Sequence, residues 1–276
     1  MQHPDIAFIG GGNMARSLIG GLVDTGWPAA RIHVADPLPE ARAALAAAWP
    51  GLAVHEANDE AIAGCSACVL AVKPQVLPEV AEALAPALQT HPQLVVSIAA
   101  GIREADLDRW LGGGHPIVRC MPNTPALVRS GASGLHANER VSPAQRELAE
   151  HILRAVGLVV WVEHEAQIDA VTAVSGSGPA YFFLVMEAMT AAGERLGLDR
   201  DTARLLTLET ALGAARLALE SGEDIASLRE KVTSKGGTTE AALRVLTEGG
   251  LPELFDEALK AAARRAAELA EQLGAR

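Results

Sequence analysis

The sequence predicts an α/β fold in which a Rossmann-like, doubly wound, mostly parallel sheet is followed by an all-α dimerisation domain. From Ile6 to Val162, short apolar runs alternate with helical segments, and a glycine-rich turn follows the first run. Beyond Glu163 the strand patterns stop and every segment has helical periodicity. We therefore expect a dinucleotide-binding domain over residues 1–163 and a helical dimerisation and substrate-binding domain over residues 164–276.

The first domain is built from short strands separated by helices. Continuous apolar runs are typical of parallel strands that are covered on both faces, and alternation with helices predicts crossover connections. The strands that we expect are Ile6–Ile9, Ile32–Ala35, Val69–Val72, Leu94–Ile98, Ile117–Val118, Gly131–His136 and Leu158–Val162. The helices that we expect between them include Asn13–Thr25, Pro39–Ala48 and Pro143–Val156.

The second domain has long, alanine-rich amphipathic helices. Apolar residues recur at helical spacing in two segments, Leu205–Leu219 and Phe255–Leu273. Such faces fit either a self-contained bundle or a surface that completes its burial against a second copy. We favour a homodimer, because a symmetric copy supplies a matching apolar face. A ring of such dimers is compatible with the same pattern.

Composition excludes several classes of protein. The 276 residues are 49% hydrophobic and 21% charged, with 23 basic and 34 acidic residues and a formal charge of −11. Without a basic cluster, we expect no nucleic-acid partner. No apolar run approaches the roughly 20 residues of a membrane span, and the first expected strand leaves no room for a signal peptide. We expect a cytoplasmic protein that does not bind membranes.

The cysteines and histidines predict no metal site. Cys65 and Cys68 have C-x-x-C spacing, but a second pair is missing and Cys120 lies far away in the sequence. The 8 histidines are scattered, with no pair at metal-ligand spacing. We interpret the three cysteines as structural or incidental residues of a reducing compartment.

A dinucleotide-binding turn follows the first expected strand. Gly10-Gly11-Gly12-Asn13-Met14-Ala15 fits G-x-G-x-x-A, in which Gly10 allows a tight turn and Gly12 lets a diphosphate approach the backbone. The helix that opens at Asn13 and Met14 then faces the phosphates with its N-terminus. Asp36 follows the second strand, where a carboxylate holds the ribose 2′-hydroxyl of NADH and repels the 2′-phosphate of NADPH. The alternative for Asp36 is a helix cap.

A second candidate binding turn lies in the helical half. Ser234-Lys235-Gly236-Gly237-Thr238-Thr239 leads directly into an alanine-rich helix. Unpaired backbone N–H groups at a helix N-terminus, surrounded by hydroxyl groups, suit a small carboxylate. The alternative is an ordinary N-cap.

Together the motifs resemble those of pyrroline-5-carboxylate reductases, from Gly10 to Leu243 and in the same order. Besides the two turns already described, the resemblance rests on three segments: Ala71-Val72-Lys73-Pro74, Arg119-Cys120-Met121-Pro122-Asn123-Thr124-Pro125, and Ile168-Asp169-Ala170-Val171-Thr172-Ala173-Val174-Ser175-Gly176-Ser177-Gly178-Pro179-Ala180-Tyr181. It implies reduction of 1-pyrroline-5-carboxylate, a cyclic imine, to L-proline by hydride transfer from NAD(P)H, the last step of proline biosynthesis.

The resemblance also implies roles for individual residues. Coenzyme contacts fall on Ala71, Val72, Lys73, Pro74, Asn58, Ala99, Ala100 and Asn123, with Asn123 near the nicotinamide. Substrate contacts fall on Ser234, Gly237, Thr238 and Thr239, and the Thr239 hydroxyl, the candidate catalytic group, lies near the ring nitrogen. Glu165 matches an acidic residue near the same nitrogen, although a solvated surface carboxylate explains it equally well.

One departure from the family concerns the coenzyme. Many relatives have serine or arginine in place of Asp36, so Asp36 favours NADH in this chain while the resemblance alone implies NAD(P)H.

Two other functions fit parts of the sequence. A β-hydroxyacid dehydrogenase of the 6-phosphogluconate type requires a lysine on the helix after Gly178, but residues 180–194 contain none. A non-catalytic dinucleotide sensor would not need the second turn at Gly237.

Overall fold

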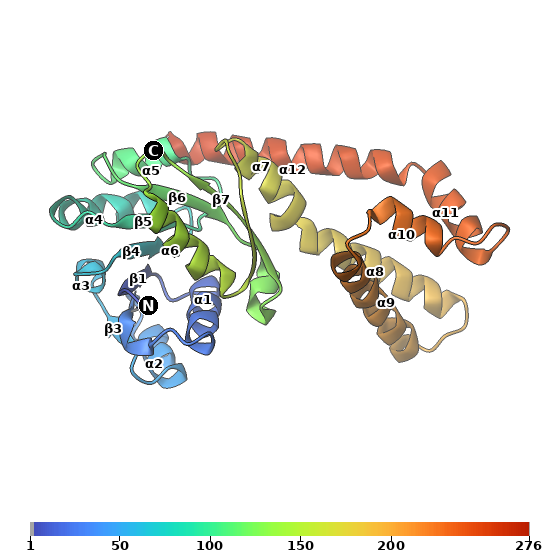
Figure 1. Ribbon diagram of the computed structural model, residues 1–276, viewed down its shortest axis with the longest axis horizontal. Helices are drawn as coiled ribbons and strands as arrows, with labels where there is room; N and C mark the ends of the chain where they lie inside the picture. The colour runs from blue at the N-terminus through green and yellow to red at the C-terminus, as the bar shows by residue number, and fades with distance from the viewer. Residues whose placement is uncertain (1–2, 276) are drawn as a thin grey trace. The chain divides into compact units, whose positions relative to one another are not determined.

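A computed structural model describes residues 3–275 of the chain (Figure 1). It divides into two compact units: the first comprises the chain up to Ser177 together with the residues from Ala261 onward, and the second is Gly178–Lys260. The domain boundary expected at Glu163 stays a prediction, since these units are defined by compactness alone.

The first unit is built on a sheet of eight strands, in agreement with the α/β prediction. Its strands are β1 (Ile6–Ile9), β2 (Ile32–Ala35), β3 (Ala53–His55), β4 (Ala67–Leu70), β5 (Leu94–Ser97), β6 (Ile117–Met121), β7 (Gly131–Ala137) and β8 (Gly157–Trp161). The spatial order is β3-β2-β1-β4-β5-β6-β7-β8. All neighbouring strands are parallel except β6 and β7, which are antiparallel. The chain therefore reverses its winding between β1 and β4, where open α/β sheets bind ligands.

Helices cover both faces of this sheet (Figure 1). In chain order they are α1 (Asn13–Asp24), α2 (Pro39–Ala48), α3 (Asn58–Ile62), α4 (Leu77–Thr90), α5 (Glu104–Trp110) and α6 (Pro143–Arg154), with short helical turns η1 (Ala29–Arg31) and η2 (Thr124–Val128). Residues of α1, α2 and α6 share one buried cluster, and residues of α3, α4 and α5 share another. The end of the last helix joins the second cluster through Leu273.

Local sequence accounts for several of these boundaries. The strand predicted at Val69–Val72 lies two residues earlier in the structure. There β4 begins at Ala67, which pairs with Ile6 of β1, and ends at Leu70. Strand β3 was missed; it has three half-buried residues and therefore no continuous apolar run. Helix α6 begins with a capping box, in which the Ser142 side chain and Gln145 satisfy each other's backbone N–H groups.

A helical segment follows β8 and leads out of the sheet unit. It consists of α7 (Gln167–Val171) and a π-helical turn, η3 (Thr172–Gly176), and continues into α8 (Gly178–Arg195). Residues 167–195 form one stretch that is long and apolar enough, by length and composition, to cross a membrane. The sequence expectation that no run reaches this length was therefore wrong. This stretch was missed because alanine and glycine are interspersed in it with the larger apolar residues, so the sequence shows no continuous run of large apolar side chains as long as a membrane span. By itself this stretch is weak evidence for a membrane span, because helices of soluble proteins pass the same test.

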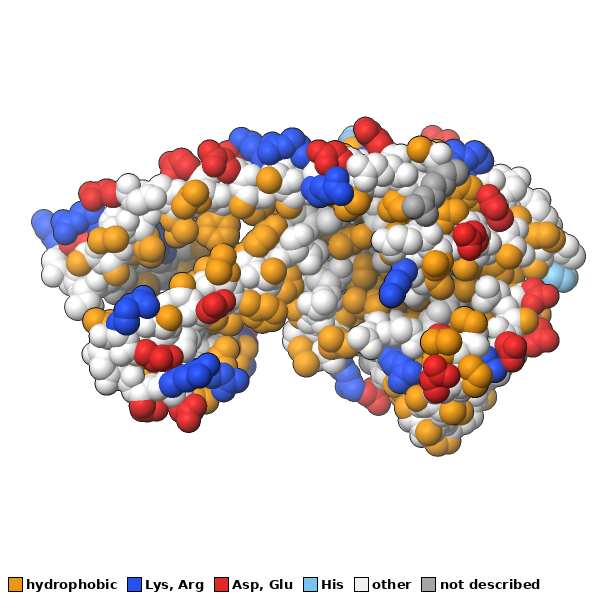
Figure 2. Space-filling model, turned by 180° about the vertical axis from the view of Figure 1, so that it is seen from behind, with side chains coloured by type: hydrophobic (Ala, Val, Ile, Leu, Met, Phe, Trp, Pro, Cys, Tyr) orange, Lys and Arg blue, Asp and Glu red, His pale blue; other side chains and the backbone are white. Residues whose placement is uncertain are grey.

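The second unit consists of helices joined by short loops, with no strand among its described residues. Its helices are α8, α9 (Arg200–Ser221), α10 (Ile225–Lys231), α11 (Thr238–Glu248) and the first part of α12 (Leu251–Gly274). Many large apolar side chains of α8 and α9 are exposed, including Phe182, Phe183, Leu205 and Leu212. Figure 2 shows hydrophobic side chains on the surface of these helices. A single chain thus leaves this apolar surface uncovered.

Candidate active site

The glycine-rich turn forms an open cradle at the carboxyl end of β1, a central strand of the sheet. Gly10 has a positive φ of 97°, and a side chain there would lie 3.0 Å from the carbonyl oxygen of Ala71. A side chain at Gly12 would meet nothing within 4 Å, so the space beside this residue is open. Gly12 is also the N-cap of α1 and provides no side-chain cap. The first N–H groups of α1 therefore face a space that suits a dinucleotide diphosphate.

Asp36 is connected directly to this cradle. It is 9% exposed and follows the last residue of β2. Its Oδ2 accepts a hydrogen bond from Gly11 N at 2.9 Å, and its Oδ1 accepts one from Leu38 N at 2.9 Å. Each carboxylate oxygen keeps a further lone pair for a ribose hydroxyl. The alternative of a simple helix cap does not account for the bond to Gly11.

The other residues that resemblance assigned to the coenzyme lie in the loops after the parallel strands. Asn13 and Met14 open α1 after β1, and Asn58 opens α3 after β3. Ala71, Val72, Lys73 and Pro74 follow β4, Ala99 and Ala100 follow β5, and Asn123 follows β6. Because parallel strands end at the same edge, the fold brings these positions to the edge that holds Gly12. Their individual contacts with a coenzyme stay predictions.

The Asn123 side chain is occupied inside the protein. Its Nδ2 donates to the carbonyl of Ser175 at 3.1 Å, and its Oδ1 accepts from Ala132 N at 2.9 Å. The first bond ties the loop after β6 to the π-helical turn η3. A π-turn is frequent at functional sites.

A partly buried charge cluster fixes Glu165 to the sheet. Its Oε1 accepts from the Arg119 guanidinium at 2.6 Å and from Glu104 N at 2.7 Å. Glu104 Oε1 in turn lies 2.5 Å from His136 Nδ1, and burial raises the pKa of Glu104. Alongside, Asp169 accepts from Arg103 at 2.9 Å.

Sequence reasoning assigned no role to the partners of Glu165. Arg119 lay inside a recognised motif, yet it is 46 residues away from Glu165, and Glu104 is 61 residues away. No local spacing signals such pairs. The predicted place of Glu165 near the substrate nitrogen stays a prediction.

The second candidate binding turn is the start of α11. Gly236 has a positive φ of 72° and donates its N–H to Glu240 Oε2 at 2.7 Å. Gly237 is the N-cap and carries no side chain to cap the helix, so Thr238 and Thr239 begin α11 with their backbone N–H groups available to a ligand. Ser234 accepts from Gly237 N through its carbonyl at 2.9 Å. This geometry can bind a carboxylate.

The cysteines do not form a reactive pair. Cys65, Cys68 and Cys120 are all buried free thiols. Burial raises the pKa of Cys65 to about 12 and raises the pKa values of the other two as well. Among the residues that the structure describes, no cluster of three or more acidic, histidine or cysteine side chains could hold a metal ion.

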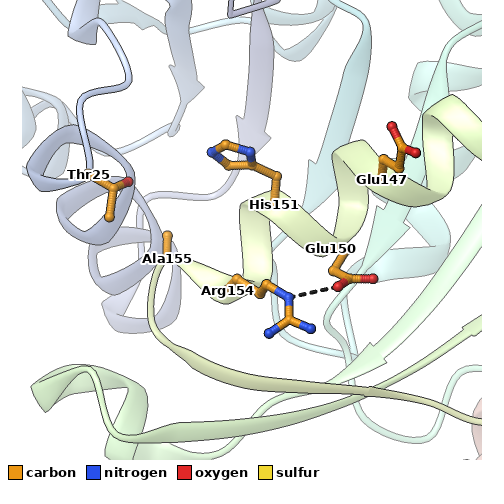
Figure 3. Close-up of a pocket in the computed structure, with 6 residues that line it drawn as sticks. All are labelled: Thr25, Glu147, Glu150, His151, Arg154 and Ala155. Atoms are coloured by element: carbon orange, nitrogen blue, oxygen red, sulfur yellow. Dashed lines mark hydrogen bonds and ion pairs between the residues drawn. The ribbon is translucent and has the colours of Figure 1, made fainter.

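A surface hollow of about 390 Å³ lies at the other end of α1 (Figure 3). Its lining residues come from the end of α1 and from α6: Thr25, Glu147, Glu150, His151, Arg154 and Ala155. Arg154 and Glu150 are paired with each other at 2.7 Å. Since Gly12 and Thr25 cap opposite ends of α1, this hollow is not part of the coenzyme edge.

Comparison with known proteins identifies the family. The family model for pyrroline-5-carboxylate reductase dimerisation matches residues 165–269, and that for coenzyme F420-dependent NADP oxidoreductases matches residues 5–101. The chain is 60% identical to a pyrroline-5-carboxylate reductase of Pseudomonas aeruginosa, over 99% of this chain and 100% of that protein. It is 44% identical to one of Pasteurella multocida, over 98% of both chains.

Solved structures agree. A pyrroline-5-carboxylate reductase of Coxiella burnetii superposes with a TM-score of 0.93 at 48% identity, covering 96% of this chain and 98% of that one. The pyrroline carboxylate reductase of Plasmodium falciparum, solved with NADP bound, gives a TM-score of 0.84 at 26% identity, covering 98% of this chain and 99% of that one. Both the fold and the full-length sequence therefore show that this chain belongs to the pyrroline-5-carboxylate reductase family.

Proposed function

We propose that this chain reduces 1-pyrroline-5-carboxylate to L-proline with a nicotinamide coenzyme, as the last step of proline biosynthesis. The observation that carries the proposal is 60% identity to a reductase of that name over 99% of the chain. The open cradle beside Gly12 supports it, because an NAD(P)H-dependent reductase must first bind a dinucleotide.

The coenzyme, when bound, supplies the hydride that reduces the imine carbon. In this proposal the first N–H groups of α1 bind the diphosphate and Asp36 accepts a hydrogen bond from the adenosine ribose. The Plasmodium relative was solved with NADP. We propose that this chain instead prefers NADH, because a 2′-phosphate would lie beside the Asp36 carboxylate.

The start of α11 is proposed as the substrate-binding turn. Because the Gly237 N–H already donates to the Ser234 carbonyl, the neighbouring backbone N–H groups of Thr238 and Thr239, with help from Ser234, bind the substrate carboxylate, which the positive end of the helix dipole also stabilises. The Thr239 hydroxyl then orients the ring nitrogen or relays a proton to it. A protonated imine is already electrophilic, so the protein contributes mainly by holding two reactants in position, which is worth up to about 7–11 kcal/mol in favourable cases.

A homodimer is the proposed assembly. The family model that covers residues 165–269 is one for dimerisation, and α8 and α9 leave large apolar side chains uncovered in the single chain. Covering this surface with a second copy also gives the apolar stretch 167–195 an explanation other than a membrane. We propose that the enzyme is cytoplasmic. We also propose that its dimers can associate into a ring.

The proposal is tested by following coenzyme oxidation in the presence of pyrroline-5-carboxylate. For Thr239→Val we expect kcat/KM to fall about ten- to a thousandfold, since one hydrogen bond to the reacting nitrogen is lost. The matched control is Thr247→Val, which makes the same substitution at the exposed far end of α11.

Two results would contradict this proposal. Near wild-type turnover in Thr239→Val would remove its hydroxyl from the mechanism. Coenzyme binding by the wild-type chain without any turnover would favour the non-catalytic sensor.

A further inference from the structure

We infer that Glu56 is a second determinant of coenzyme preference, because it holds the Arg42 guanidinium away from the position that a ribose 2′-phosphate would take. This inference rests on the proposed use of NADH or NADPH. Glu56 does not itself touch the coenzyme in this account; it is a positioning residue that acts through Arg42.

Arg42 lies over the turn that contains Asp36. Its Nη1 donates to the carbonyl of Asp36 at 2.8 Å and to the carbonyl of Pro37 at 3.0 Å. Its Nη2 forms an ion pair with Glu56 Oε2 at 2.8 Å. The guanidinium is thus placed at the residue that we assign to the ribose, and one edge of it is turned to Glu56.

Glu56 is anchored beside the same turn from the neighbouring strand. It directly follows His55, the last residue of β3, whose carbonyl accepts from Asp36 N at 3.2 Å. Its own side chain is 76% exposed, whereas that of Arg42 is 20% exposed. A pair this exposed contributes little to folding stability, so its energetic effect on a ligand can be measured without unfolding the protein.

The charges beside the turn suit a neutral ribose better than a charged one. Asp36 and Glu56 are both negative, and the Arg42 guanidinium is already paired with Glu56 at 2.8 Å. A 2′-hydroxyl adds no charge to this group. A 2′-phosphate adds about two negative charges and is best bound by an arginine with free, fork-like donors.

This arrangement predicts that the two carboxylates act together. Removing Asp36 alone relieves direct repulsion, but Arg42 stays paired with Glu56. Removing Glu56 alone frees Arg42, but Asp36 still repels the phosphate. Only the double substitution gives a 2′-phosphate both space and an unpaired arginine, so the two effects are coupled rather than additive.

The experiment measures Kd for NADH and for NADPH on the full-length chain by calorimetry, without imine. The variants are Asp36→Ser, Glu56→Gln and their combination. We expect the ratio Kd(NADPH)/Kd(NADH) to fall about tenfold for Asp36→Ser, about threefold for Glu56→Gln and about a hundredfold or more for the double variant, because one charge-assisted hydrogen bond is gained.

Three further variants test the mechanism. Glu60→Gln removes one negative charge from an exposed side chain of α3 near the same edge, 3.9 Å from His55 Nδ1, without freeing Arg42. It should leave the ratio unchanged. Adding Arg42→Met to the double variant should abolish the gain in NADPH affinity, and Glu56→Asp should keep the wild-type ratio.

The inference is overturned if the double variant shows only the product of the two single effects, or if Glu60→Gln shifts the ratio as much as Glu56→Gln. Failure of the proposed function has a different signature, because wild-type protein would then bind a coenzyme normally and fail to oxidise it when pyrroline-5-carboxylate is added.

Discussion

Replacing Glu165 by glutamine removes the negative charge that faces the Arg119 guanidinium while keeping the size of the side chain. Arg119 is 3% exposed, and Glu165 Oε1 lies 2.6 Å from it. The same oxygen accepts from Glu104 N, a bond that the glutamine carbonyl can preserve. The substitution therefore isolates one charge-assisted contact.

The size of the effect follows from this geometry. A hydrogen bond between charged groups contributes about 1.5–3 kcal/mol, and a buried charge left without its partner costs more. The Glu165 side chain is 26% exposed, and Glu104 lies close enough to keep part of the balance, so we take the lower end. We expect a loss of about 1.5–2 kcal/mol, which lowers Tm by roughly 3–8 °C at about 2–4 °C per kcal/mol.

The assay is thermal unfolding of the full-length chain together with kcat/KM for pyrroline-5-carboxylate. If Glu165 mainly fixes the segment before α7, Tm should fall while kcat/KM changes less than about threefold. The control is Glu163→Gln, at an exposed position two residues earlier, which should change neither. An unchanged Tm together with a loss of activity above about tenfold would refute the structural reasoning and support the role near the substrate nitrogen.

Two further predictions concern titratable groups. Burial raises the pKa of Glu104 above its ordinary value of 4.5, so the folded state binds more protons at this group than the unfolded state, and the contribution of Glu104 to the free energy of unfolding should fall as pH rises above about 4.5. Urea unfolding across about pH 4.5–7 measures the free energy of unfolding of both proteins. The value for Glu104→Gln should rise relative to that of the wild type as pH rises. A difference between the two proteins that stays constant with pH would contradict this. For the cysteines, burial and the raised pKa of Cys65, about 12, predict that a thiol-specific disulfide reagent labels none of them in the native protein near pH 8 and all 3 in guanidinium. Rapid native labelling would show that the C-x-x-C pair is accessible.

Much of the sheet could be predicted because its strands are covered on both faces. β1 and β5 are buried along their whole length, and each was predicted from its apolar run. β2 was also predicted, although the half-buried His33 interrupts its buried residues. β3 and the antiparallel direction of β7 were not visible. The first is a three-residue edge strand, and the second depends on how the chain turns after η2 rather than on any periodicity.

The candidate site was only partly predictable. The Gly10–Ala15 turn and Asp36 could be found because short-range backbone geometry requires those residue types at that spacing. The side-chain contacts around these residues could not be predicted. Arg42 and Glu56 belong to different elements, and so do Arg119 and Glu165, so each pair meets only when the sheet has formed.

The central claim is that hydride passes from the coenzyme to the imine carbon of pyrroline-5-carboxylate on this chain. The most direct measurement uses full-length protein, pyrroline-5-carboxylate and NADH carrying deuterium in place of both hydrogens at nicotinamide C4, with the product analysed by NMR. The account predicts proline with one deuterium on the δ carbon, formed in step with coenzyme oxidation. Coenzyme oxidation without labelled proline, or no reaction at all, would contradict it.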